Sequence, residues 1–428
     1  MILPFGILLA AIAMAPLSAP EWWGRQYPKV ALGLGAITVA YYFLGLQAGP
    51  RVLHTATEYL SFIGLVGSLY VVSGGIHLQV KGGATPLENT FFLAVGAVLA
   101  NLFGTTGASM LMIRPWIRMN RVRITAHHVV FFIFIVSNVG GALTPIGDPP
   151  LFLGYLKGVP FWWVAEHCWP MWMVALGLLL GMFFVVDSLN FRKVPAPLQS
   201  AAREADQWTF RGGANLFFLA VILGSVFLNR PPFLREALML AAAAGSYWTT
   251  PRPIHAANHF SFHPLREVAI LFVGIFATMM PALDWLEQNA ATLGTPTPAL
   301  FFWGSGTLSS VLDNAPTYLS FLSAGIGALV TPDSVAQARV LLPDVSAAHP
   351  EVAALLSHPP LAKLLMAISM GAVFFGANTY IGNGPNFMVK AIADQQNCRT
   401  PSFPGYILRF TLPFMLPTLL VVWWLFFR

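Results

Sequence analysis

One twelve-residue stretch occurs twice in this chain of 428 residues and decides its fold. It reads GALTPIGDPPLF at residues 141–152 and GANTYIGNGPNF at residues 376–387, and seven of the twelve positions are identical. Asp148 of the first copy corresponds to Asn383 of the second. An internal repeat of this kind predicts two structural units with similar local folds.

Both copies place glycine and proline in the middle of an apolar segment. Glycine and proline interrupt a helix, and the break frees backbone groups whose partial charges can face an ion. Threonine, asparagine and aspartate add hard oxygen ligands, which suit sodium or a proton carrier better than a soft metal. The motif therefore predicts two broken helices beside a binding site. The alternative is that these residues only kink two membrane spans.

The composition predicts an all-α protein that crosses a membrane many times. Apolar residues make up 56% of the chain and charged residues only 9%, and the mean hydropathy is +0.67. Soluble domains carry about 25% charged residues, so a soluble fold is excluded. The net charge of +6 comes from basic residues between apolar runs, and we expect no nucleic-acid partner. Cys168 and Cys398 fit no zinc or redox spacing and are expected to be free thiols.

The apolar runs predict about ten spans of the length that a bilayer requires. They lie at residues 3–19, 29–47, 52–76, 124–156, 161–188, 213–229, 234–250, 267–284, 360–392 and 405–427. Two more apolar stretches, at residues 90–116 and 298–330, are interrupted by polar residues. They predict re-entrant hairpins, whose tips require protein or water to satisfy the backbone.

The basic residues predict an inverted repeat. With both hairpins re-entrant, 16 of the 23 Lys and Arg residues fall on one side, which we expect to be cytoplasmic. Both termini are then outside, in a multi-pass protein of a bacterial-type inner (plasma) membrane. The predicted units are N-terminal spans (1–51), a first repeat (52–188), a cytoplasmic linker (189–212) and a second repeat (213–428). Inverted repeats are a common plan of secondary transporters.

Ionisable side chains at membrane depth are costly and are therefore candidates for function. Asp148 lies in the first break and Asp313 at the second hairpin tip. Three other groups have both a functional and a structural interpretation. Glu58 with His54 could form a proton path or an interfacial contact, and His127 and His128 could be pH sensors or boundary residues. His255, His259 and His263 could be metal ligands or loop residues.

The segment SNVGGALTPIGD at residues 137–148, with the second copy around Asn378 and Thr379, resembles the ion transporter superfamily. That superfamily includes NhaD-type sodium/proton antiporters, citrate and dicarboxylate carriers, and arsenite-efflux pumps. The string Asn-x-Gly-Gly-x-x-x-Pro-Ile-Gly-Asp is most similar to the NhaD-type and related sodium:proton antiporters. The resemblance implies a scaffold domain, a transport domain that moves between two faces, and a possible homodimer.

The resemblance also implies one sodium site in each repeat. The first would consist of Thr105, Thr106, Asn138, Thr144, Gly147 and Asp148. The second would consist of Asp313, Asn314, Thr317, Asn378, Thr379 and Asn383, with the Asn386 amide available for an anion. The hairpin tips differ from the Ser-Asn-Thr of dicarboxylate carriers, because they read Thr-Thr-Gly and Asp-Asn-Ala here.

Two functions follow as alternatives. The first is a sodium/proton antiporter that exchanges ions at Asp313 with Asn314, or else at Asp148. The second is a sodium- or proton-coupled carrier of citrate, a dicarboxylate or arsenite, with Asn378 and Asn386 holding the anion.

An enzyme is not expected, because the common hydrolase and zinc-protease motifs are missing from the sequence. The expected partners are the lipid bilayer and small ions, with no cofactor beyond transported or coupling Na⁺ and H⁺. We also expect Asp313 and Asn383 to act together as Asp148 does alone.

Overall fold

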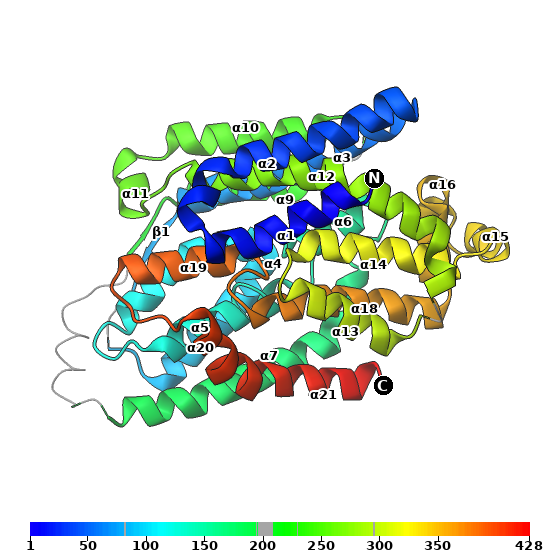
Figure 1. The fold of residues 1–428 in the computed structure, drawn as a ribbon. Coiled ribbons are helices and arrows are strands. Elements are labelled where there is room, and N and C mark those ends of the chain that lie inside the picture. Colours follow the sequence, from blue (N-terminus) through cyan, green and yellow to red (C-terminus); the bar gives the residue numbers. More distant parts are fainter. Residues whose placement is uncertain (81–82, 194, 196–208, 229, 294–295) are drawn as a thin grey trace.

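The computed structural model describes residues 1–80, 83–193, 195, 209–228, 230–293 and 296–428. Nearly all of its regular structure is helical, and β1 (His77–Gln79) and β2 (Thr209–Arg211) form one short antiparallel ribbon. Most of the long helices run along one common direction, and both termini lie toward the end opposite β1 (Figure 1). The predicted all-α membrane fold is confirmed.

The helices follow the predicted order. The first part of the chain forms α1 (Leu3–Ser18), α2 (Pro20–Ala40), η1 (Tyr41–Gly45), α3 (Gly49–Gly74), α4 (Pro86–Met119), α5 (Ala126–Ile135), η2 (Val139–Gly141), α6 (Pro149–Leu156) and α7 (Trp163–Phe191). The second part forms α9 (Asn215–Ser225), α10 (Leu234–Thr249), α11 (Arg252–Ala257), α12 (His263–Asn289), η3 (Ala290–Leu293), α13 (Pro298–Ser309), α14 (Asn314–Leu329), α15 (Pro332–Leu341), α16 (Pro343–Ala348), α17 (Pro350–Ser357), α18 (Pro359–Phe375), η4 (Gly376–Asn378), α19 (Gly384–Gln395), α20 (Phe403–Tyr406), η5 (Ile407–Met415) and α21 (Leu416–Phe426).

The helix α4 is a re-entrant hairpin that turns back at Gly104 (φ 71°, ψ 157°). Its two arms are antiparallel, because the rings of Phe92 and Trp116 stack with centroids 5.7 Å apart. At its open end the N–H of Ala84 donates to the carbonyl of Met119 at 3.2 Å. The hairpin is longer than the predicted range of 90–116, since Thr85 caps the first arm before α4 begins.

The second hairpin consists of α13 and α14, joined by a four-residue tip at residues 310–313. Phe301 and Phe321 meet edge to face across its arms with centroids 5.5 Å apart. The open end leads into α15, at the end of the molecule opposite β1 (Figure 1). The two hairpins therefore open in opposite directions, as the inverted repeat predicts.

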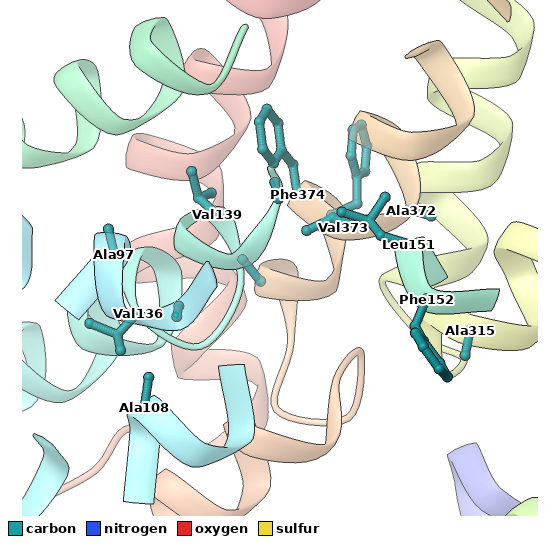
Figure 2. Packing of buried hydrophobic residues seen from close by; sticks show 14 of the residues in the cluster. Ala97, Ala108, Val136, Val139, Leu151, Phe152, Ala315, Ala372, Val373 and Phe374 are labelled. Atoms are coloured by element: carbon teal, nitrogen blue, oxygen red, sulfur yellow. The ribbon is translucent and has the colours of Figure 1, made fainter. Parts of the chain in front are cut away.

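Apolar side chains of both hairpins and both broken helices pack around the helix breaks (Figure 2). They include Ala97 and Ala108 of α4, Val136, Val139, Leu151 and Phe152 around the first break, Ala315 of α14, and Ala372, Val373 and Phe374 of α18; all are buried. Because these small and branched side chains exclude water, polar groups at the breaks require partners within the protein.

The long apolar helices give a count of membrane spans. Among the described residues, seven helices are long and apolar enough to cross a membrane, or eight if α14 and α15, which bend by 106°, count as one span. The helices α1 and α9 are apolar but shorter, and the first broken helix is interrupted. The total of ten spans, the domain boundaries and the orientation stay predictions. Most of the predicted 189–212 linker lies outside the described residues.

Replacement of Gly104 tests the hairpin turn. Its backbone conformation is adopted almost only by glycine, and a Cβ there would lie 3.2 Å from the carbonyl oxygen of Ile146. We expect Gly104→Ala to lower the free energy of unfolding by about 1–3 kcal/mol. The measurement is thermal unfolding in detergent, with Gly64→Ala of α3 as the control because open space surrounds Gly64. Equal melting temperatures for both variants would contradict the turn.

Candidate ion-binding site

The two breaks share their local geometry. Asp148 precedes α6 at φ −143° and ψ 143°, and Asn383 precedes α19 at φ −153° and ψ 141°. In each break a threonine hydroxyl accepts from a glycine amide: Gly147 N–H reaches Thr144 Oγ1 at 3.1 Å, and Gly382 N–H reaches Thr379 Oγ1 at 3.1 Å. The sequence repeat is thus also a repeat of individual hydrogen bonds.

Each break is also tied to its own hairpin in the same way. The Thr144 hydroxyl donates to the carbonyl of Asn101 at 2.7 Å, and the Thr379 hydroxyl donates to the carbonyl of Ser310 at 2.5 Å. The Asn101 amide also donates to Gly140 O at 2.7 Å, and the Asn378 amide donates to Ser310 Oγ at 2.9 Å. The sequence reasoning missed Asn101 and overlooked Ser310 as a partner, although each is a polar residue within an apolar run.

Asp148 is the point where the two repeats meet. Its carboxylate accepts from Thr105 Oγ1 at 2.7 Å and from the amide of Asn383 at 3.1 Å, both at Oδ1. The other oxygen, Oδ2, accepts from the Asn314 amide at 2.5 Å. These donors come from the first hairpin, the second broken helix and the second hairpin, so one side chain joins four elements.

The charge of this carboxylate has no counterion among the described residues. Asp148 is only 1% exposed, and the three side chains that donate to it are neutral. A buried charge without a counterion is strongly unfavourable, particularly at membrane depth. The site therefore fits a carboxyl group that binds either a proton or a small cation.

A small cavity lies beside Asp148. Its volume is about 20 Å³, and it is lined by residues 103–107 of the first hairpin, residues 145–149 of the break, Phe152, and three residues of α3. A cavity of this size has room for about one water molecule or a bare ion. In this conformation it is too small for citrate.

The asparagines form a chain of amides across the repeats. The Asn383 amide also donates to Ser137 O at 3.1 Å and to Asn138 Oδ1 at 3.2 Å. The Asn138 amide donates to Asn386 Oδ1 at 2.7 Å, and the Asn386 amide donates to Gly376 O at 2.7 Å. Position 383 therefore faces acceptors while position 148 faces donors. This difference explains why one copy of the motif has an amide and the other a carboxylate.

The remaining predicted ligands lie around this centre with different roles. Asp313 caps α14, because its Oδ1 accepts from the N–H of Ala315 at 3.0 Å. The Thr317 hydroxyl donates to the carbonyl of Asp313 at 3.0 Å, and Thr106 lines the small cavity. The predicted pairing of Asp313 with Asn383 is not what the structure shows, since the Asn383 amide donates to Asp148 instead.

Glu58 lies away from this centre. His54 Nδ1 is 3.7 Å from Glu58 Oε1, and Lys157 Nζ, just after α6, is 2.7 Å from the same oxygen. The lysine was not foreseen, because it follows Glu58 by 99 positions in the sequence. This geometry fits the interfacial alternative for Glu58, since the lysine balances its charge.

The matched threonines offer a test of the repeat. Thr379→Val should cost about 2 kcal/mol of stability, because Gly382 N–H then loses its only partner among the described residues. Thr144→Val should cost only about 1 kcal/mol, because Gly147 N–H also reaches the Thr144 carbonyl at 2.9 Å. Chemical or thermal unfolding of the two purified variants measures both values. A larger loss in Thr144→Val would contradict this bonding pattern.

One known protein family matches nearly the whole length of the chain. A family model described as "Putative citrate transport" matches residues 1–427. No curated protein matches the chain. Both hairpins, both broken helices and Asp148 lie inside the matched region.

Proposed function

Because the chain belongs to this family of citrate-type transporters, we propose that it is a secondary active transporter in which Asp148 binds the coupling ion. The observation that carries the proposal is a buried carboxylate with only neutral donors, at the junction of two inverted repeats. The reaction that this site supports best is exchange of sodium for protons. The protein lies in a plasma membrane, and both of its termini are on the outer side.

Exchange needs only competition for one carboxylate. Sodium is held while Asp148 is ionised, and a proton on the carboxyl group removes the charge that attracts the cation. Asn314 suits both states, because its Nδ2 donates to Asp148 Oδ2 while its Oδ1 is buried and has no partner in the described chain. Rotation of this amide would let Oδ1 accept from a protonated Asp148 or bind a cation.

The second candidate is a carrier that moves a citrate-type anion together with the coupling ion. The family description favours it, and the amides of Asn378 and Asn386 are the groups proposed to hold the anion. The cavity beside Asp148 is too small for citrate, so this function requires a second conformation with a wider site.

The experiment uses the purified protein in liposomes that contain a pH-sensitive dye. An acid-inside gradient is imposed, and Na⁺, Li⁺, K⁺ and citrate are added in turn. Collapse of the gradient by Na⁺ or Li⁺ alone supports exchange, whereas uptake of labelled citrate that requires Na⁺ or an inward proton gradient supports the anion carrier. Asp344→Asn, an acid-to-amide change at an exposed residue of α16, is the control and should behave as wild type. No collapse of the gradient by Na⁺ or Li⁺, together with no uptake of labelled citrate, would contradict both functions.

A further inference from the structure

A second buried polar cluster lies at the opposite end of α5 from Asn138. It forms where the segment before α5 and the first turn of α5 meet the last turns of α7. Its members are Arg123, Thr125, His127, His128 and Asp187, and Asn89 joins them from the first hairpin. The proposed exchange at Asp148 uses none of these side chains.

Asp187 is the acceptor at the centre of this cluster and is fully buried. Arg123 binds both of its oxygens, with NH2 at 2.9 Å from Oδ2, and the Asn89 amide donates to Oδ2 at 2.9 Å. Nε2 of His128 lies 3.0 Å and Nε2 of His127 lies 3.2 Å from Oδ1. One carboxylate and one guanidinium thus balance each other when both imidazoles are neutral.

The two histidines differ at their other ring nitrogen. Nδ1 of His128 faces the backbone N–H of Thr125 at 3.2 Å, which favours a proton on Nε2, and the Thr125 hydroxyl lies 3.3 Å from the same nitrogen. Nδ1 of His127 lies 2.6 Å from the Thr125 hydroxyl, which can accept. Both nitrogens of His127 therefore face groups that can receive a proton. His127 is also 8% exposed whereas His128 is fully buried.

We propose that His127 is a second proton-binding site, separate from the carboxyl group of Asp148. Protonated His127 donates from Nε2 to Asp187 and from Nδ1 to Thr125, and this charged pair ties the first turn of α5 to α7. The charged groups that face it are Asp187 of α7, Arg123 before α5, and the ring of His128, whose centroid is 4.0 Å away. Histidine is the side chain that proteins use most often to bind a proton reversibly.

The link to the ion site is α5 itself. His127 lies in its first turn, and Ser137 and Asn138, which accept from the Asn383 amide, follow its last turn. The two ends are roughly 15 Å apart along the helix axis. A proton at His127 fixes one end of the helix whose other end positions the partner of Asp148.

A metal ion is the other ligand that two histidines and an aspartate can bind. Arg123 argues against it, because its guanidinium already occupies both oxygens of Asp187. The amide of Thr125 argues against it as well, because it leaves the proton of neutral His128 on the nitrogen that would have to bind the metal. The geometry therefore favours a proton.

The test is thermal unfolding of the full-length protein in detergent at pH 6 and pH 8. Loss of the proton removes the charged pair, so the wild-type melting temperature should fall by about 2 °C or more between pH 6 and pH 8. His127→Gln keeps a polar side chain without a titratable charge and should lose this difference. The control, His167→Gln at the other end of α7, should keep it. A His127→Gln variant with the wild-type difference would overturn the proposal.

Two further measurements keep the test decisive. Thr125→Val removes the acceptor for His127 Nδ1 but keeps the backbone amide, so it should also reduce the pH difference, even where His127→Gln does not fold. Zn²⁺ should leave the wild-type melting temperature unchanged. A rise with Zn²⁺ that His127→Gln abolishes would make the cluster a metal site and would overturn the proton assignment. Neither readout measures transport, so a failure of this proposal can be distinguished from a failure of the function proposed for Asp148.

Discussion

Asp148→Asn is expected to reduce coupled transport to the background level of empty liposomes while the protein stays folded. The change removes the charge of Asp148 but keeps the size of the side chain. The Asn314 amide can turn so that its free Oδ1 accepts from the new amide, and Thr105 and Asn383 keep their acceptor at Oδ1. The stability change should therefore stay within about 1 kcal/mol.

Transport and unfolding are measured on the same preparation of Asp148→Asn. Asp313→Asn is the informative comparison, because Asp313 lies at the neighbouring tip but caps α14 instead of joining the two repeats. It should lower the rate without abolishing exchange. Normal exchange in Asp148→Asn, with loss in Asp313→Asn, would move the ion site to the hairpin tip.

Asn383→Asp is expected to be the most destabilising of the conservative changes at the site, by about 3–5 kcal/mol. The new carboxylate would face the carbonyl of Ser137, the side-chain oxygen of Asn138 and the carboxylate of Asp148. Asn138 can rotate its amide, but the Ser137 carbonyl cannot become a donor. The measurement is unfolding in denaturant, compared with Asp148→Asn.

A double variant in which the residues at positions 148 and 383 are exchanged tests this second prediction further. Asp148→Asn combined with Asn383→Asp moves the carboxylate across a 3.1 Å contact without changing the composition of the site. Because donors surround position 148 and acceptors surround position 383, the double variant should stay unstable and should not recover transport. Recovery to near wild-type exchange would mean that the two motif copies are equivalent, and the asymmetry described above would be wrong.

The sequence predicts the elements of this fold because their signals are local. Gly104 lies inside an apolar run, and glycine and proline mark both breaks, so the hairpins and broken helices can be placed without a structure. The ends of the helices are less predictable, because caps such as Thr85 extend a hairpin into segments that are not apolar.

Five of the predicted ligands meet around Asp148: Thr105, Asn138, Asn314, Asn383 and Asn386.

The sharing of one carboxylate could not be predicted from the motifs. Each motif suggests a site inside its own repeat, but the bonds to Asp148 come from Asn314, 166 positions later, and Asn383, 235 positions later. Asp187 could not be identified from the sequence for a related reason. In the sequence it is only the polar end of an apolar span, and its partner Arg123 lies 64 positions earlier. Pairings over such distances depend on the packing of whole helices.

The most direct test of Asp148 as the coupling site is binding of radioactive sodium to the purified protein as a function of pH. Protons and sodium compete for the same carboxylate, so sodium binding should weaken as the pH falls and should be lost in Asp148→Asn at every pH. Sodium binding that is independent of pH, or that is retained in folded Asp148→Asn, would contradict the assignment of the site to Asp148.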